Sequence, residues 1–186
     1  MLLMRNMPRL SQNKPLYLFS SLALNAAAVI LHELGHALFY IMQGIRVHLT
    51  LVSAKPLSGM ATIPGLLGGF VLNASTALLF LILYLRSPRL VYFLIVLANT
   101  FFARILFYLF AFLARSFPYD EIQIAGAWHT EPWVVSLCGM GLMLAILIPA
   151  LLILRRHTNT KQRRIYLSLS FLGGILSLLG VAALGG

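Results

Sequence analysis

Five long apolar runs dominate this chain of 186 residues and limit what it can fold into. They cover residues 16–42, 65–85, 90–114, 133–154 and 166–185. A helix needs about 20 predominantly apolar residues to cross the hydrocarbon core of a bilayer. A helix also satisfies its backbone hydrogen bonds internally, as a hydrocarbon environment requires. The sequence therefore predicts an all-α membrane protein, a bundle of about five transmembrane helices.

The composition supports this prediction and argues against a nucleic-acid partner. Charged residues make up 10% of the chain and hydrophobic residues 60%, whereas a soluble domain carries about 25% charged residues. The net charge of +10 resides in short segments between apolar runs, not in a basic stripe with interleaved aromatics, so no nucleic-acid partner is expected. We expect an integral multi-pass protein in contact with the lipid bilayer, in the plasma membrane.

The chain divides into a basic N-terminal segment (1–15), a membrane core (16–132) and two further transmembrane helices (133–186). The first apolar run is expected to be a retained span, because it is too long for a signal peptide. Glycine, proline and charged residues interrupt 43–64, and 47–52 alternates like a short strand. A short β-hairpin or re-entrant loop is therefore predicted after the first span.

The Lys and Arg residues predict an orientation. Cytoplasmic loops carry an excess of these residues. Ten of the fourteen lie in the N-terminal segment and in 86–89 and 155–165, whereas 43–64 and 115–132 hold three; the last, Arg104, falls inside the third run. This distribution favours a cytoplasmic N-terminus.

The first run contains the motif His32-Glu33-Leu34-Gly35-His36. Ionisable residues at membrane depth are costly and are functional by default. Residues i and i+4 share one helix face, about 5–6 Å apart at Cβ, so both imidazoles can bind one metal ion. In the H-E-x-x-H pattern two His bind Zn²⁺, and Glu33 is the general base for a metal-bound water. A metal-free hydrogen-bonded cluster is the weaker interpretation, because it must explain three costly residues in one apolar span.

A catalytic zinc needs a third protein ligand and an open position. Counting crossings places 115–132 on the same side of the membrane as the end of the first run, and His157 on the opposite side. Asp120 is the favoured third ligand, because Pro118 ends the preceding helix and lets the chain turn back into the bundle. Other candidates in this segment are Glu121, then His129 and Glu131.

HELGH inside a membrane-spanning helix resembles the site-2 protease family of intramembrane zinc metalloproteases. Gly44-Ile45-Arg46-Val47 is similar to the glycine turn that leads into that family's membrane-embedded hairpin. Gly69-Phe70-Val71-Leu72-Asn73 has the spacing of the family's G-P-x-x-N element, with Phe where Pro is usual. The resemblance covers roughly residues 16–126 and does not include the last two runs.

The resemblance implies a zinc endopeptidase that hydrolyses peptide bonds within or near transmembrane segments, in regulated intramembrane proteolysis. Asp120 takes the place of the aspartate in the family's Asp-Gly motif, although Glu121 follows it. Asn73 would hydrogen-bond a substrate backbone, the alternative being a contact between helices. The expected partners are a membrane-protein substrate, either a transmembrane helix or a signal-peptide remnant, and a regulatory membrane protein. The family generally holds its site toward the cytosol, whereas the charge distribution puts His36 nearer the other face.

Two other functions share the motif. The first is a catalytically inactive scaffold or chaperone of the same family. The second is a metal carrier that uses His32, His36 and Asp120 as a transient site. A carrier usually has paired halves with broken helices at matching positions, and no internal repeat is visible in the sequence, so the carrier ranks last.

Overall fold

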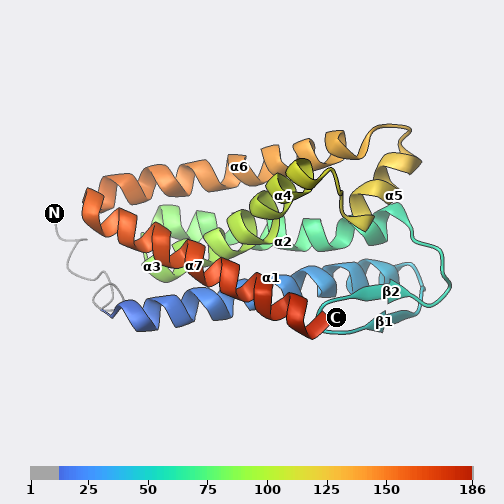
Figure 1. Cartoon of the computed structure of the whole chain (residues 1–186), viewed down its shortest axis with the longest axis horizontal. Coiled ribbons are helices and arrows are strands. Elements are labelled where there is room, and N and C mark those ends of the chain that lie inside the picture. Colours follow the sequence, from blue (N-terminus) through green and yellow to red (C-terminus); the bar gives the residue numbers. More distant parts are fainter. Residues whose placement is uncertain (1–12, 186) are drawn as a thin grey trace.

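The computed structural model describes residues 13–185, without the side chains of 101–104, 181–182 and 184–185. It is an elongated bundle of helices (Figure 1). In chain order the helices are α1 (Lys14–Met42), α2 (Ile63–Arg86), α3 (Leu90–Leu97), the π-helical segment η3 (Ala98–Ile105), α4 (Leu106–Ala114), α5 (Tyr119–Ala127), α6 (Pro132–His157) and α7 (Thr160–Gly185). Most of the basic N-terminal segment, with Arg5 and Arg9, and the side chain of Arg104 lie outside the described part.

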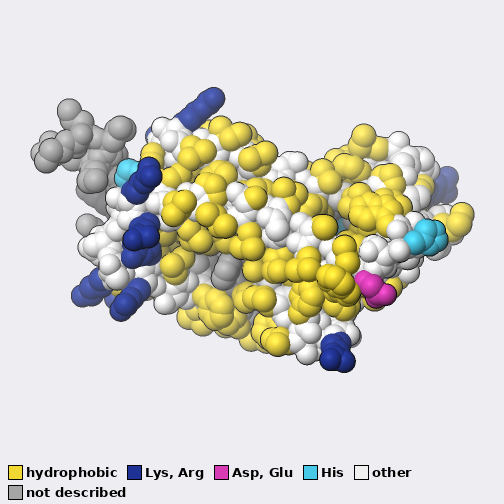
Figure 2. Space-filling model, turned by 90° about the horizontal axis from the view of Figure 1, so that it is seen from above, with side chains coloured by type: hydrophobic (Ala, Val, Ile, Leu, Met, Phe, Trp, Pro, Cys, Tyr) yellow, Lys and Arg dark blue, Asp and Glu magenta, His cyan; other side chains and the backbone are white. Residues whose placement is uncertain are grey.

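Three of the helices, α1, α2 and α6, are long and apolar enough to cross a membrane. Apolar side chains cover much of the flank between the two ends of the molecule (Figure 2). Both observations fit the predicted membrane protein with mostly helical structure. The run at 90–114 and helix α7 are not among the three candidate spans found in the described residues, so five crossings stay a prediction.

The predicted hairpin after the first span is confirmed. Strands β1 (Val47–Leu49) and β2 (Ala54–Pro56) pair antiparallel. The first strand is shorter than the alternating stretch 47–52, because the Thr50 N–H already closes the turn on the carbonyl of Ser53 at 2.8 Å. Gly44, with φ of +75°, turns the chain out of α1 toward the hairpin.

The third apolar run is helical throughout but widens in its middle into η3. The Asn99 amide donates to the carbonyl of Ile95 at 3.0 Å, and the Thr100 hydroxyl to that of Val96 at 2.7 Å. Side chains that bond a carbonyl one turn back compete with the α-helical ladder, which favours a π-helical segment at this place. The sequence does not predict this change of helix type.

Helix α5 lies within 115–132, where the sequence indicates only a polar connection. Helix α4 ends where Arg115 adopts a left-handed conformation (φ 51°), three residues before Pro118. Pro118 then precedes the first residue of α5, and two acidic residues occupy its first turn, where the helix dipole favours them. The chain does turn back after Pro118, since α5 packs against α2 and α6.

Helices α1 and α2 touch through their backbones. A Cβ added at Gly35 would fall on the carbonyl of Gly68, and one added at Gly68 would fall on the carbonyl of Gly35. Neither residue can therefore carry a side chain while the helices keep this distance. The two glycines thus let α1 and α2 approach closely.

Basic side chains gather at one end of the bundle (Figure 2). This basic end is formed by the start of α1, the connection from α2 to α3 and that from α6 to α7 (Figure 1). Its described members are Lys14, Arg86, Arg89, Arg155, Arg156, Lys161, Arg163 and Arg164. The hairpin and α5 lie at the opposite end, and His157 at the basic end, as predicted.

The glycine contact can be tested by adding a methyl group. Gly68→Ala forces α1 and α2 apart, and we expect it to destabilise the protein by about 1–3 kcal/mol, the usual range for overpacking. Thermal unfolding in detergent measures the change. Gly141→Ala in α6 is the matched control, because a Cβ there meets nothing within 4 Å. Equal stability of the two variants would show that the close contact is absent.

Candidate metal centre

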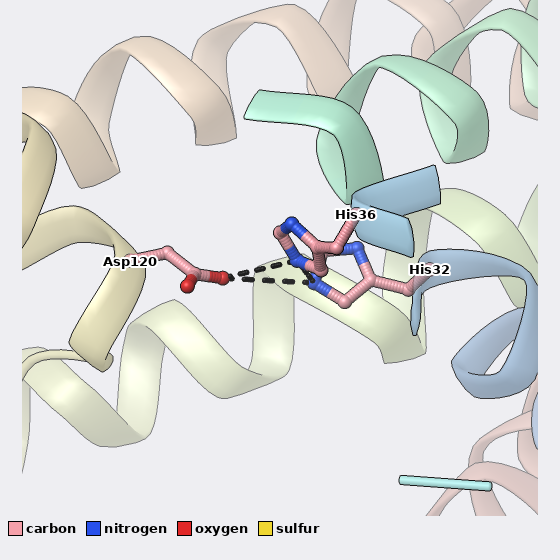
Figure 3. A group of neighbouring side chains, drawn as sticks. All are labelled: His32, His36 and Asp120. Atoms are coloured by element: carbon pink, nitrogen blue, oxygen red, sulfur yellow. Dashed lines mark hydrogen bonds and ion pairs between the residues drawn. The ribbon is translucent and has the colours of Figure 1, made fainter. Parts of the chain in front are cut away.

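Three side chains from two distant parts of the sequence converge at the hairpin end of the bundle. His32 and His36 come from α1, and Asp120 comes from the first turn of α5 (Figure 3). The two Nε2 atoms lie 3.0 Å apart. Asp120 Oδ2 lies 3.2 Å from Nε2 of His36 and 3.9 Å from Nε2 of His32. The two imidazoles and one carboxylate therefore direct one ligand atom each at a common point.

These separations can be compared with those of a tetrahedral zinc site. With metal–ligand distances of about 2.0–2.2 Å, neighbouring ligand atoms are roughly 3.3 Å apart. The observed values of 3.0, 3.2 and 3.9 Å bracket this figure. Two nitrogens and one oxygen form a ligand set of catalytic zinc sites, which leave a fourth position open. The residues present thus fit a zinc ion.

The backbone of α2 orients one of these ligands. Nδ1 of His36 lies 2.7 Å from the carbonyl oxygen of Gly65. A carbonyl can only accept, so Nδ1 carries the proton and Nε2 keeps its lone pair toward His32 and Asp120. Metal-binding histidines are usually held by such a second hydrogen bond. No sequence signal identifies Gly65, because its contribution is a backbone atom.

Gly69 provides the space in which the imidazoles lie. A Cβ added there would fall on the ring of His32 and on Nε2 of His36. Any other residue would displace at least one ring from its position beside Asp120. This steric requirement gives the first residue of the Gly69–Asn73 element a physical role at the centre.

A cleft of about 580 Å³ opens beside the three ligands. Glu33 lines it together with His36 and Asp120, which places the predicted general base and two of the ligands around one space. Tyr40, one turn after His36, lies on the same wall, and strand β2 borders the cleft. The side chain of Asp120 is 25% exposed and that of His36 only 6%, so water reaches the centre mainly from the side of Asp120.

Other candidates from the sequence do not join the centre. The cluster of possible metal ligands in the described part of the chain consists of His32, His36 and Asp120, and it includes none of Glu121, His129 and Glu131. Asn73 is fully buried, and neither atom of its amide has a hydrogen-bond partner among the described residues. It is not among the residues that line the cleft, so its contact with substrate stays a prediction.

No protein-family model matches this chain, and searches of curated proteins and of solved structures find no match either. The resemblance to site-2 proteases therefore depends on the motifs quoted above, and the functions it implies remain predictions.

Metal analysis of the purified protein tests the centre. We expect one zinc ion per chain, and Asp120→Asn should weaken zinc binding at least tenfold, because it removes the only anionic ligand. Glu121→Gln is the matched control from the neighbouring position and should leave the affinity unchanged. Loss of zinc from Glu121→Gln, with retention by Asp120→Asn, would assign the third ligand to Glu121 instead.

Proposed function

We propose that this protein is an intramembrane zinc endopeptidase that hydrolyses peptide bonds within or near the transmembrane segments of membrane proteins. The observation that carries the proposal is the convergence of His32, His36 and Asp120 beside a cleft that Glu33 also lines. An H-E-x-x-H motif alone is short. The arrangement becomes specific with Asp120, whose Oδ2 lies 3.2 Å from Nε2 of His36 although the two residues are 84 positions apart in the sequence.

The proposed topology has five spans and a cytoplasmic N-terminus. The basic end supports it, because Lys and Arg accumulate on the cytoplasmic side of membrane proteins. His36 is six residues from the end of α1, about 9 Å along the helix axis. The metal centre then lies within the membrane, closer to the non-cytoplasmic face.

The chain supplies the groups that peptide hydrolysis needs. Bound zinc would polarise the substrate carbonyl and lower the pKa of water toward about 7. Glu33 lines the cleft, where it would accept a proton from the attacking water and return one to the leaving amine. The Gly65 carbonyl keeps His36 in one tautomer throughout. These groups account for general acid–base catalysis at a fixed centre.

A substrate helix has to unwind before its carbonyl reaches the centre, because a helix engages its own backbone groups. Strand β2 borders the cleft and can receive an extended peptide as an added strand. Bonded and non-bonded pairs alternate along an antiparallel ladder. Thr50 and Ser53 form a hydrogen-bonded pair, so the next pair, Leu49 and Ala54, is a non-bonded one. The N–H groups of that pair point away from the partner strand. Ala54 N–H is then available to the substrate.

The proposed substrate is a membrane protein, with a transmembrane helix or a signal-peptide remnant as the segment that is cut. The regulatory membrane protein that the family resemblance implies stays a prediction.

The role of Glu33 can be separated from metal binding. Glu33→Gln removes the base and retains the shape of the side chain, so we expect cleavage of transmembrane substrates to fall at least about 100-fold with zinc content unchanged. Glu131→Gln, at an exposed position before α6, is the control and should cleave normally. Zinc binding without cleavage of any substrate by the wild type would favour the inactive scaffold or the carrier.

Strand addition predicts different effects of proline on the two edges of the hairpin. Ala54→Pro removes the outward N–H on the strand that borders the cleft. We expect cleavage to fall about fivefold or more, because this is the effect of losing one hydrogen bond. Leu49→Pro removes the equivalent N–H from the far edge and should have little effect. Cleavage rates at equal zinc content provide the measurement. Equal activity of the two variants would exclude pairing with β2.

A further inference from the structure

A second cavity lies on the other side of Asp120. It has a volume of about 220 Å³, is lined by residues of α2, α4, α5 and α6, and is partly open at the surface. Its walls are mainly apolar, and include Phe70, Ile124, Val135 and Leu142. His32, His36 and the hairpin do not line it.

This cavity adjoins the polar cleft. Asp120 and Leu66 line both spaces, so they form the boundary between them. Asp120 is also the residue whose carboxylate lies 3.2 Å from His36. The apolar cavity therefore adjoins the cleft directly beside the candidate metal centre.

We propose that the apolar cavity is a specificity pocket that receives one large aliphatic or aromatic side chain of the substrate, next to the bond that is cut. This inference rests on the proposed peptidase function. A peptide whose carbonyl lies at the metal centre has its neighbouring side chains within a few ångströms of that point, and the cavity adjoins the same point at Leu66 and Asp120.

The size and the chemistry of the cavity identify its occupant. An apolar protein cavity of about 150 Å³ holds a benzene molecule, so one of about 220 Å³ has room for the side chain of Leu, Met or Phe. The acidic residues Asp120 and Glu121 also line the cavity, and their negative charge disfavours an acidic side chain. Alanine would leave most of the cavity empty and would lose the contacts that a larger side chain gains.

Helix α6 offers a matched pair of positions for a test. Both Cys138 and its neighbour Leu137 are exposed, but only Cys138 lines the cavity. A tryptophan at Cys138 would fill the cavity, and a tryptophan at Leu137 would put the same side chain outside it. Gly139 is unsuitable, because a Cβ there would lie 2.8 Å from the hydroxyl oxygen of Tyr108.

The first experiment uses the wild-type protein with zinc bound. The cleavage position in a transmembrane substrate is found by mass spectrometry, and the residue on each side of it is then changed in turn to Ala, Leu, Phe, Asp or Lys. On one side we expect Leu and Phe to be cleaved about tenfold faster than Ala or more, with Asp slowest. Equal rates on both sides, or a preference for Lys, would overturn the specificity pocket.

The second experiment repeats the series with Cys138→Trp and Leu137→Trp. We expect Cys138→Trp to cleave the Leu and Phe substrates about tenfold more slowly or worse, and to retain cleavage of the Ala substrate. Its zinc content should be unchanged. Leu137→Trp should keep the wild-type order of cleavage rates among the substrates. The same order in both variants would overturn the pocket and leave the peptidase function intact. No cleavage of any substrate by zinc-loaded wild type would overturn both. If Cys138→Trp does not fold, the wild-type series decides.

Discussion

Helices α1 and α2 meet backbone to backbone at Gly35 and Gly68, and the metal centre depends on that contact. Lipid does not drive helices together by the hydrophobic effect, so close van der Waals contact between small residues has to hold them. At this distance the carbonyl of Gly65 reaches His36, and Gly69 leaves room for both imidazoles. A larger residue at any of these positions would separate the helices or displace a ligand.

The polar groups of the centre lie in a largely apolar bundle, and the fold limits what this costs. Helix α5 turns back after Pro118 and brings the carboxylate of Asp120 to the imidazoles, so each of the three has a partner within 4 Å. The polar cleft then borders the centre, and the apolar cavity adjoins it at Asp120. In the proposed enzyme the cleft carries the hydrolysis and the cavity selects the side chain.

The sequence predicts the parts of this site that follow from local spacing and from counting membrane crossings. The i, i+4 spacing places His32 and His36 on one face, and the number of crossings places Asp120 on their side. The sequence does not predict helix α5, because the segment that forms it is too short and too polar to show helical periodicity. The carbonyl of Gly65 and the boundary at Leu66 are tertiary features, which depend on how closely two helices approach.

X-ray absorption spectroscopy at the zinc edge of the purified protein tests whether His32, His36 and Asp120 bind zinc. We expect zinc with about four nitrogen and oxygen ligands at about 2.0–2.2 Å, with the multiple-scattering pattern of two imidazoles. His36→Ala should remove the scattering of one of them. Zinc bound through sulfur, zinc without imidazole ligands, or a protein that binds no zinc would exclude this centre.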